Sequence, residues 1–267
     1  MFKDITMGQY FPGNTLIHRL DPRTKLVLTL LYIIVLFLAK GIWSYAVMLA
    51  FLSVCVILSR IKLSVLLSGA KPIVFIIIIT GILNLFYTKG EHLLFRVWRI
   101  SVYLEGLQTA GFLILRILLL ICCTLLLTYT TSPLQLTDAM EALLNPLKKL
   151  RFPVHELSMM MSIALRFIPT LIKETDKIMS AQKARGADFE TGSLRQRAKA
   201  LLPLLIPLFV GAFRRADELA TAMESRCYHG GEGRTKMKQL RMAAADWAAL
   251  VSGAALTVAV VLLRRAG

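Results

Sequence analysis

The chain has 267 residues, of which 56% are hydrophobic, a proportion too high for an ordinary soluble domain. Lys and Arg number 32 against 16 Asp and Glu, which leaves a net charge of +16. In so apolar a chain this surplus predicts basic loops that contact anionic lipid headgroups. Nucleic acid is disfavoured as a partner, because aromatic residues do not alternate with the basic ones.

The sequence contains five apolar segments that are candidates to cross a membrane, which takes about 20 mostly apolar residues. They cover residues 26–43, 45–59, 72–87, 104–130 and 246–263, and the third is short. We therefore predict an all-α integral membrane protein with about five transmembrane helices. Arg116 falls midway along the fourth segment, where an arginine either has a function, pairs inside the bundle or marks a displaced boundary.

Loop charges predict the orientation. Basic residues cluster at positions 19–25 and 60–71, whereas the turn after the first segment has only Lys40, so the N-terminus is predicted to be cytoplasmic. Five crossings then place the C-terminus outside. Arg264 and Arg265 there contradict the tendency of basic residues to stay on the cytoplasmic side. In the stretch before the first segment, Asp21 reads as a helix N-cap followed by Pro22, and a phosphate contact through Arg23 is the less favoured reading.

More than half of the basic residues and most of the acidic ones lie between residues 131 and 242, and so many charges cannot sit in lipid. This predicts three parts: an N-terminal membrane domain (1–131), a cytoplasmic region (132–242) and a C-terminal transmembrane helix (243–267). The cytoplasmic region opens with a short amphipathic helix that Ser132 caps, with Pro133 in its first turn.

Two long amphipathic helices follow, at residues 154–185 and 194–228. The first should be kinked at Pro169, and the apolar start of the second is interrupted by Pro203 and Pro207. Gly186 stops the first helix, and three glycines, Gly230, Gly231 and Gly233, stop the second. Each helix has an apolar stripe at helical spacing, with Leu157, Met160, Met161, Ala164, Ile168, Leu171 and Ile172 in the first and Phe213, Ala216, Ala220, Met223 and Cys227 in the second.

Each long helix ends in an arginine between small residues. The first end reads Ala184, Arg185, Gly186 and the second reads Ser225, Arg226, Cys227. A single such arginine would be explained by the helix dipole, which is worth about 0.3–1 kcal/mol. Two matched ends favour another role, in which each unobstructed guanidinium enters a pocket and pairs with a carboxylate on another protein.

These motifs resemble the transmembrane T component of energy-coupling factor (ECF) transporters, the scaffold of bacterial vitamin and micronutrient importers. That family has two Xaa-Arg-Xaa motifs, typically Ala-Arg-Gly. The second motif here departs at Ser225 and Cys227 but keeps its arginine. The stretches "HRLDPRTKL" (18–26) and "LRFIPTL" (165–171) also look like family sequence, and the resemblance covers nearly the whole chain.

The resemblance implies that the chain is a non-catalytic subunit in the bacterial cell membrane. Two ABC-type ATPases would dock on the arginine-tipped coupling helices, and a small integral-membrane substrate-binding S component would pack against the spans. "HRLDPRTKL" is closest to the scaffold that several S components share, with a dedicated cobalt or biotin scaffold as the alternative. The residues agree that the chain is not an ATPase, since no GxxxxGK[ST] phosphate loop is present.

Two other classes remain open from the residues alone, namely the permease domain of another ABC importer and a membrane-embedded enzyme. The first would favour polar residues paired within several spans, and the second lacks support from any HExxH motif or acidic cluster. No metal or cofactor is expected. His155 and His229 are far apart, and the four cysteines (Cys55, Cys122, Cys123, Cys227) have no metal-ligand spacing.

Overall fold

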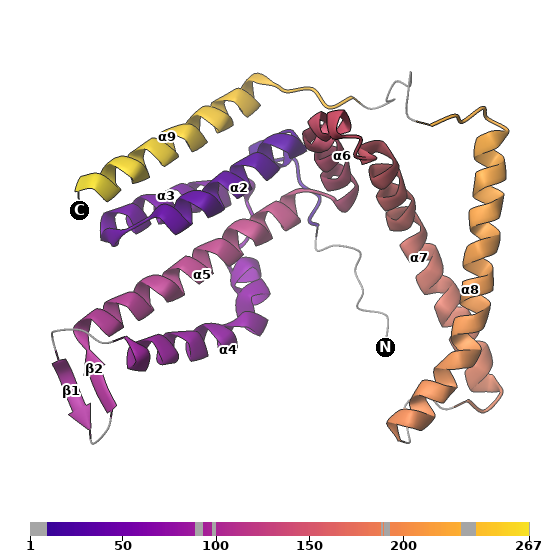
Figure 1. Ribbon diagram of the computed structural model, residues 1–267, viewed down its shortest axis with the longest axis horizontal. Helices are drawn as coiled ribbons and strands as arrows, with labels where there is room; N and C mark the ends of the chain where they lie inside the picture. The colour runs from indigo at the N-terminus through magenta and orange to yellow at the C-terminus, as the bar shows by residue number, and fades with distance from the viewer. Residues whose placement is uncertain are drawn as a thin grey trace. The chain divides into compact units, whose positions relative to one another are not determined.

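The computed structural model describes residues 10–88, 93–97, 100–187, 189, 193–230 and 239–266, most of them helical (Figure 1). Gly231 and Gly233 lie outside these residues. The chain forms two compact units. The bundle comprises Gly8–Ala139 with Leu240–Gly267, and the helix-pair unit is built from Met140–Gln239.

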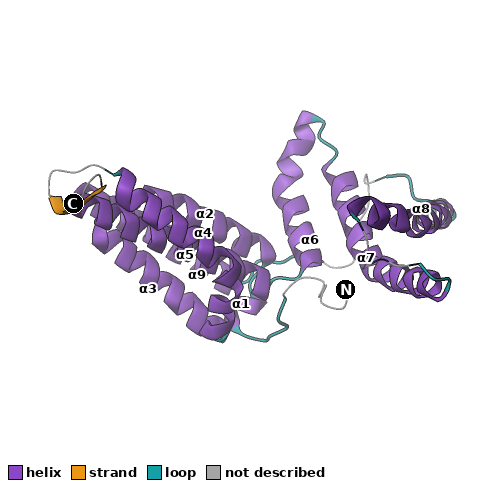
Figure 2. Cartoon of the chain, turned by 90° about the horizontal axis from the view of Figure 1, so that it is seen from below, coloured by secondary structure: helices purple, strands orange, loops and turns teal. Residues whose placement is uncertain are grey.

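Five long helices make up the bundle, and they run side by side (Figure 2). They are α2 (Pro22–Leu38), α3 (Gly41–Ser59), α4 (Leu63–Tyr87), α5 (Leu104–Thr130) and α9 (Ala244–Ala266). The short helix α1 (Leu16–Arg19) precedes them, and an antiparallel hairpin of β1 (Leu93–Val97) and β2 (Ile100–Tyr103) connects α4 to α5. The core lies among α2, α3, α5 and α9, around Tyr32, Met48, Leu119, Leu126 and Val260.

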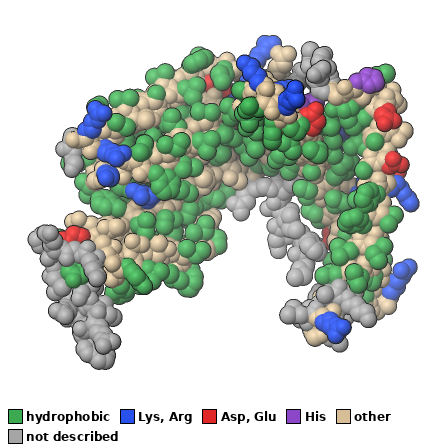
Figure 3. Space-filling view, in the orientation of Figure 1, with side chains coloured by type: hydrophobic (Ala, Val, Ile, Leu, Met, Phe, Trp, Pro, Cys, Tyr) green, Lys and Arg blue, Asp and Glu red, His purple; other side chains and the backbone are tan. Residues whose placement is uncertain are grey.

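The prediction of a helical membrane protein is confirmed. Among the described residues, four helices are long and apolar enough to cross a membrane: α3, α4, α5 and residues Ala244–Arg265 of α9. The predicted first span, α2, is 17 residues long, short of the roughly 20 residues that a crossing takes. Apolar side chains cover the visible outer face of the bundle, as expected where lipid surrounds a protein (Figure 3).

The predicted third span was wrong at its start. Helix α4 begins at Leu63 and contains both Lys71 and Pro72, so residues 63–71 are not a loop. Proline removes one backbone donor but leaves the rest of the hydrogen-bond ladder, and a helix inside a packed bundle tolerates that loss. Lys71 is exposed, and a lysine of this kind can keep its charged group in water while its stem packs on the apolar surface. The span is therefore 25 residues long, ample for a crossing.

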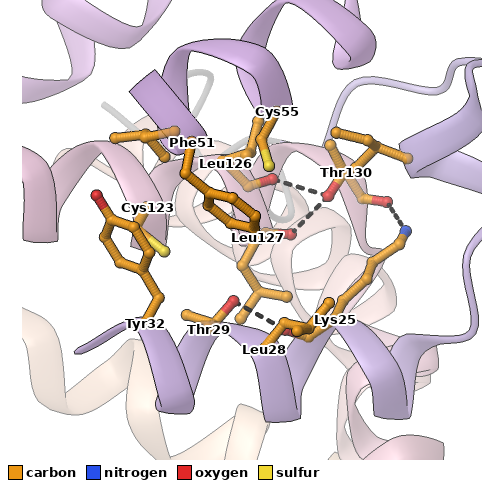
Figure 4. A pocket seen from close by; sticks show the side chains of 12 residues that line it. Lys25, Leu28, Thr29, Tyr32, Phe51, Cys55, Cys123, Leu126, Leu127 and Thr130 are labelled. Atoms are coloured by element: carbon orange, nitrogen blue, oxygen red, sulfur yellow. Dashed lines mark hydrogen bonds between the residues drawn. The ribbon is translucent and has the colours of Figure 1, made fainter. Parts of the chain in front are cut away.

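A buried polar cluster holds three helix ends together at one end of the bundle. Asp21 caps α2, as predicted, by accepting from the Arg23 backbone N–H at 2.9 Å. The Asp246 carboxylate, at the start of α9, accepts from the Asp21 N–H at 2.7 Å. The Lys25 Nζ donates to the carbonyl oxygen of Thr130, the last residue of α5, at 2.9 Å (Figure 4). The starts of α2 and α9 and the end of α5 therefore share one end of the bundle, so the chain leaves it after α5 and re-enters it before α9 at that same end.

The helix-pair unit contains α7 (Val154–Ala184) and α8 (Leu194–Glu224), each 31 residues long. Helix α6 (Pro133–Leu144) and a 3-10 turn, η1 (Asn145–Leu150), precede them. Ser132 caps α6 as predicted: its hydroxyl accepts from the Gln135 N–H, and the Gln135 side chain accepts from the Ser132 N–H. Pro203 and Pro207 do not interrupt α8, which continues through both.

Candidate docking site

Helix α7 ends in a Schellman turn, in which two backbone bonds close the last turn of a helix. Arg185 is the C-cap residue. The Gly186 N–H donates to the Lys183 carbonyl at 3.0 Å, and the Ala187 N–H donates to the Gln182 carbonyl at 3.0 Å. Gly186 has a φ of +86°, in the left-handed region, which glycine enters without the steric cost of a Cβ atom. The predicted glycine stop is confirmed.

Helix α8 ends in the same turn. The Cys227 N–H donates to the Glu224 carbonyl at 2.9 Å, and the Tyr228 N–H donates to the Met223 carbonyl at 3.0 Å. Arg226 therefore holds the position that Arg185 holds on α7. The left-handed residue here is Cys227, with a φ of +55°. The two motifs differ in sequence but have the same backbone hydrogen bonds.

Both arginine side chains are exposed, as are their four neighbours Ala184, Gly186, Ser225 and Cys227. Among the described residues, neither guanidinium has an ion-pair or hydrogen-bond partner. The backbone turn already satisfies two carbonyls at each helix end, so neither arginine is needed to cap them. The donors of both guanidinium groups remain available to a partner.

The two arginine tips lie at opposite ends of the helix pair. Helix α8 crosses α7 and runs back along it in the opposite direction (Figure 1). Just beyond Arg226, the Tyr228 hydroxyl lies 3.1 Å from the sulfur of Met159, near the start of α7, whereas Arg185 is at the other end of that helix. At 1.5 Å per residue, the part of α7 between these points is about 40 Å long. The predicted site residues therefore form two separate sites.

Sequence reasoning missed the contact that holds α7 against α8. The Arg215 guanidinium forms an ion pair with the Glu174 carboxylate at the crossing. Gly211 allows the close approach, since a Cβ atom there would lie 3.2 Å from Glu174 Oε1. No local pattern marks these residues, because helices that cross at an angle meet through only a few positions.

The predicted apolar stripes of α7 and α8 are largely uncovered. Met160 and Met161 on α7 are 54% and 44% exposed, and Phe213 on α8 is 67% exposed. Leu204, in the first half of α8, is buried, in contrast to the exposed Phe213 close to the crossing. Each long helix therefore has one face for its helical partner and a second, apolar face that no described part of the chain covers.

The cavity between α2, α3 and α5 is not a comparable site. It has a volume of about 80 Å³ and a mostly apolar lining, with Lys25 and Thr130 at one side (Figure 4). The hydroxyls of Thr29 and Tyr32 beside it already donate to backbone carbonyls. Across the described residues no group of three or more His, Cys, Asp or Glu side chains is placed to hold a metal ion.

Comparison with known proteins agrees with this architecture. A family model described as a cobalt transport protein matches residues 13–237. The energy-coupling factor transporter transmembrane protein EcfT of Thermosediminibacter oceani is 52% identical over 262 residues, which cover 98% of each chain. The proteins of the same name from Clostridium kluyveri and Bacillus subtilis are 50% and 49% identical, over 99% of this chain and 98% and 100% of their own. This chain therefore belongs to the family of transmembrane components of energy-coupling factor transporters.

Proposed function

We propose that this chain is the membrane scaffold that couples two cytoplasmic ABC-type ATPases to a small membrane-embedded S component in the plasma membrane of a bacterium. The observation that carries the proposal is the pair of exposed arginines, Arg185 and Arg226, held at two helix ends by the same backbone turn. A fixed position matters because a guanidinium recognises a carboxylate through two parallel hydrogen bonds, which need a defined geometry. The Schellman turns fix the backbone from which each arginine side chain extends.

Two separate tips suit two separate ATPases. A span of about 40 Å between the tips leaves room for one ATPase at each. Each tip would insert into a groove of its ATPase, with the arginine paired to a carboxylate there. Two weak attachments on a stiff pair give much tighter binding than either alone, because the second one forms at high effective concentration.

The helix pair would pass ATPase motion on to the membrane. ATP binding draws the two ATPases together, and hydrolysis lets them part. With an ATPase on each tip, that motion changes the angle at the crossing, where Glu174 and Arg215 pair beside Gly211. The uncovered apolar stripes with their methionines would face the S component or the membrane surface. Methionine is flexible enough to fit several partners, which suits a scaffold that several S components share.

Two narrower alternatives remain. A scaffold dedicated to cobalt or biotin would assemble with one partner only, and the matching family model is described by cobalt transport. A permease of another ABC importer would carry its own substrate path. The relatives of about 50% identity, named as energy-coupling factor components, favour the scaffold over the permease. Counting the different S components that co-purify with the chain separates the shared from the dedicated type.

Substitution of the two arginines tests the docking role. If they only complement the helix dipole, Arg185→Lys and Arg226→Lys are nearly silent, because the charge at the helix end is kept. If they make forked contacts, lysine weakens docking, and alanine costs about 2–5 kcal/mol by leaving a buried partner charge unpaired. ATPase retention on the purified membrane complex, with vitamin uptake measured alongside, is the readout.

The single alanine variants should weaken the complex, and the double variant should release both ATPases. Lys177→Ala is the matched control, since Lys177 is an exposed cation on α7 away from its tip. Retention in that control should equal the wild type. Full ATPase retention and normal uptake in the Arg185→Ala, Arg226→Ala double variant would refute the docking role.

A further inference from the structure

Arg116, midway along α5, is held against the turn that joins α2 to α3. Its Nε donates to the Tyr45 hydroxyl at 2.9 Å, and its Nη2 lies 3.5 Å from the Ala39 carbonyl oxygen. The guanidinium carbon also lies over the rings of Phe37 and Tyr45, at 5.7 and 5.9 Å from their centroids. Within the described part of the chain, Arg116 has no carboxylate partner. A guanidinium that lies against aromatic rings and has no carboxylate partner favours an anion from outside the chain as its counter-ion.

The α2–α3 turn does not reach as far as the neighbouring helices. From the Lys25–Thr130 contact, about 20 Å of helix leads along α2 to Ala39, and a similar length leads back along α5 to Arg116. Helices α4 and α5, with 25 and 27 residues, are much longer than α2 with 17. The short α2–α3 hairpin thus leaves a step beside α5. Since the hydrocarbon core is about 30 Å thick, Arg116 lies within or at the edge of it.

A cavity of about 380 Å³ occupies this step. Its lining includes Arg116 and Lys40, the hydroxyl-bearing Thr109, and the aromatic rings of Tyr45 and Phe112, but no carboxylate. Lys40 is exposed and precedes α3 without forming a side-chain cap. Arg116 and Lys40 are the two cations of a lining that contains no carboxylate, so the cavity attracts a group with a net negative charge, such as a phosphate diester.

The surroundings of the cavity are apolar and aromatic. Phe37, Ile42 and Trp43 flank the α2–α3 turn and are 60%, 68% and 74% exposed. Exposed tryptophan is typical of the membrane interface, where the headgroups lie. Basic side chains gather on the same end of the bundle, where α9 also ends with Arg264 and Arg265 (Figure 3). The apolar side chains can pack against acyl chains while the cations face the headgroup.

We propose that the Arg116 cavity binds the phosphate of an anionic phospholipid, in the leaflet at the α2–α3 end of the bundle. Arg116 would donate to the phosphate oxygens from the guanidinium edge that Tyr45 does not occupy, and Lys40 would add its charge at the mouth. The acyl chains would lie along Phe37 and Ile42. The cavity lies near the boundary between the headgroups and the hydrocarbon core. This position favours a lipid over a soluble anion, because the membrane already holds a lipid phosphate close to this depth. The proposal does not depend on the docking of ATPases.

Lipid binding to the purified full-length chain tests the proposal. The lipids are phosphatidylglycerol and phosphatidylcholine with matched acyl chains, titrated in detergent, and bound copies are counted by native mass spectrometry. Wild-type protein should prefer phosphatidylglycerol, and Arg116→Gln should bind it about tenfold more weakly, as expected for the loss of a hydrogen-bonded charge. Arg60→Gln is the control, because Arg60 is an exposed arginine that caps α3 at its far end. Equal phosphatidylglycerol affinity of wild-type and Arg116→Gln protein overturns the proposal.

Two further arms identify the source of the anion, and two further variants guard against misfolding. Inorganic phosphate should not displace phosphatidylglycerol, and displacement at equal concentration would assign the cavity to a soluble anion instead. If Arg116→Gln does not fold, Arg116→Lys and Lys40→Gln carry the test. Each should bind several-fold more weakly, and wild-type affinity in both overturns the proposal. In the complex isolated with its partners, an unchanged lipid count in Arg116→Gln together with loss of a membrane partner would assign Arg116 to a carboxylate of that partner.

Discussion

Arg185 and Arg226 occupy the same place in two identical turns, but the residue that follows each one differs. Gly186 adopts its left-handed backbone without cost, whereas Cys227 has a Cβ atom at a φ of +55°. For a residue other than glycine, this conformation costs roughly 1–2 kcal/mol. The end of α8 is therefore predicted to be less stable than the end of α7, although both present an arginine.

Exchanging these two residues tests how far the turn positions the arginine. Cys227→Gly should remove the strain, stabilise the last turn of α8 by about 1 kcal/mol and leave ATPase retention at or above the wild-type level. Gly186→Ala should destabilise the end of α7 by about the same amount and reduce retention. Amide hydrogen exchange at residues 186–187 and 227–228 measures the turn directly. A loss of retention in Cys227→Gly would mean that the thiol itself contacts the ATPase.

At the scale of elements, α8 contains two prolines in a helix that remains continuous. Each proline removes a backbone hydrogen bond and allows the helix to bend at that point. Both lie before the crossing with α7, in the exposed apolar half of α8. This half can therefore bend independently of the part that bears Arg226.

Replacing Pro203 and Pro207 with alanine should stiffen α8 and raise its helical stability. We expect ATP hydrolysis to couple less well to vitamin uptake in the double variant, while the complex still assembles. The ratio of uptake to ATP hydrolysed in proteoliposomes is the measurement, with each single variant as an intermediate case. Unchanged coupling in the double variant would show that bending at these prolines has no part in transport.

Features fixed by neighbouring residues were predictable. The caps Asp21 and Ser132, the glycine stop at Gly186 and the start of α8 at Leu194 each follow from a few adjacent residues, and the structure has them as predicted. Features that depend on distant parts of the chain were not predictable. The start of α4 before Pro72 and the pairing of Glu174 with Arg215 depend on the surrounding helices. The exposure of both arginine tips, in contrast, follows from their place at helix ends.

At the scale of the whole molecule, the polar cluster at Asp21, Lys25, Thr130 and Asp246 constrains the topology. Since α5 ends and α9 begins at the same end of the bundle, both connections to the helix-pair unit emerge there. Helices α2, α3, α4, α5 and α9 then run in alternating directions along the bundle, so α9 ends at the opposite end. That the helix-pair unit is cytoplasmic remains a prediction from its basic surplus.

Thiol labelling in intact cells tests this orientation. Single cysteines at Lys199 and Arg234, in a background without the four native cysteines, should resist a membrane-impermeant reagent. Arg234 lies outside the described residues, but the prediction depends only on the side of the membrane. A cysteine at Arg265, exposed at the far end of α9, is the positive control and should be labelled. Labelling of the first two from outside would reverse the orientation and remove the basis for docking.

The scaffold role is tested most directly by the composition of the complex that this chain forms in its own host. The tagged chain is purified from membranes in mild detergent, and its partners are identified and counted by mass spectrometry. The account predicts two ATPase subunits and one small integral-membrane protein per chain, with different small proteins in different copies if the scaffold is shared. A chain that purifies without ATPases and transports a substrate alone would contradict it.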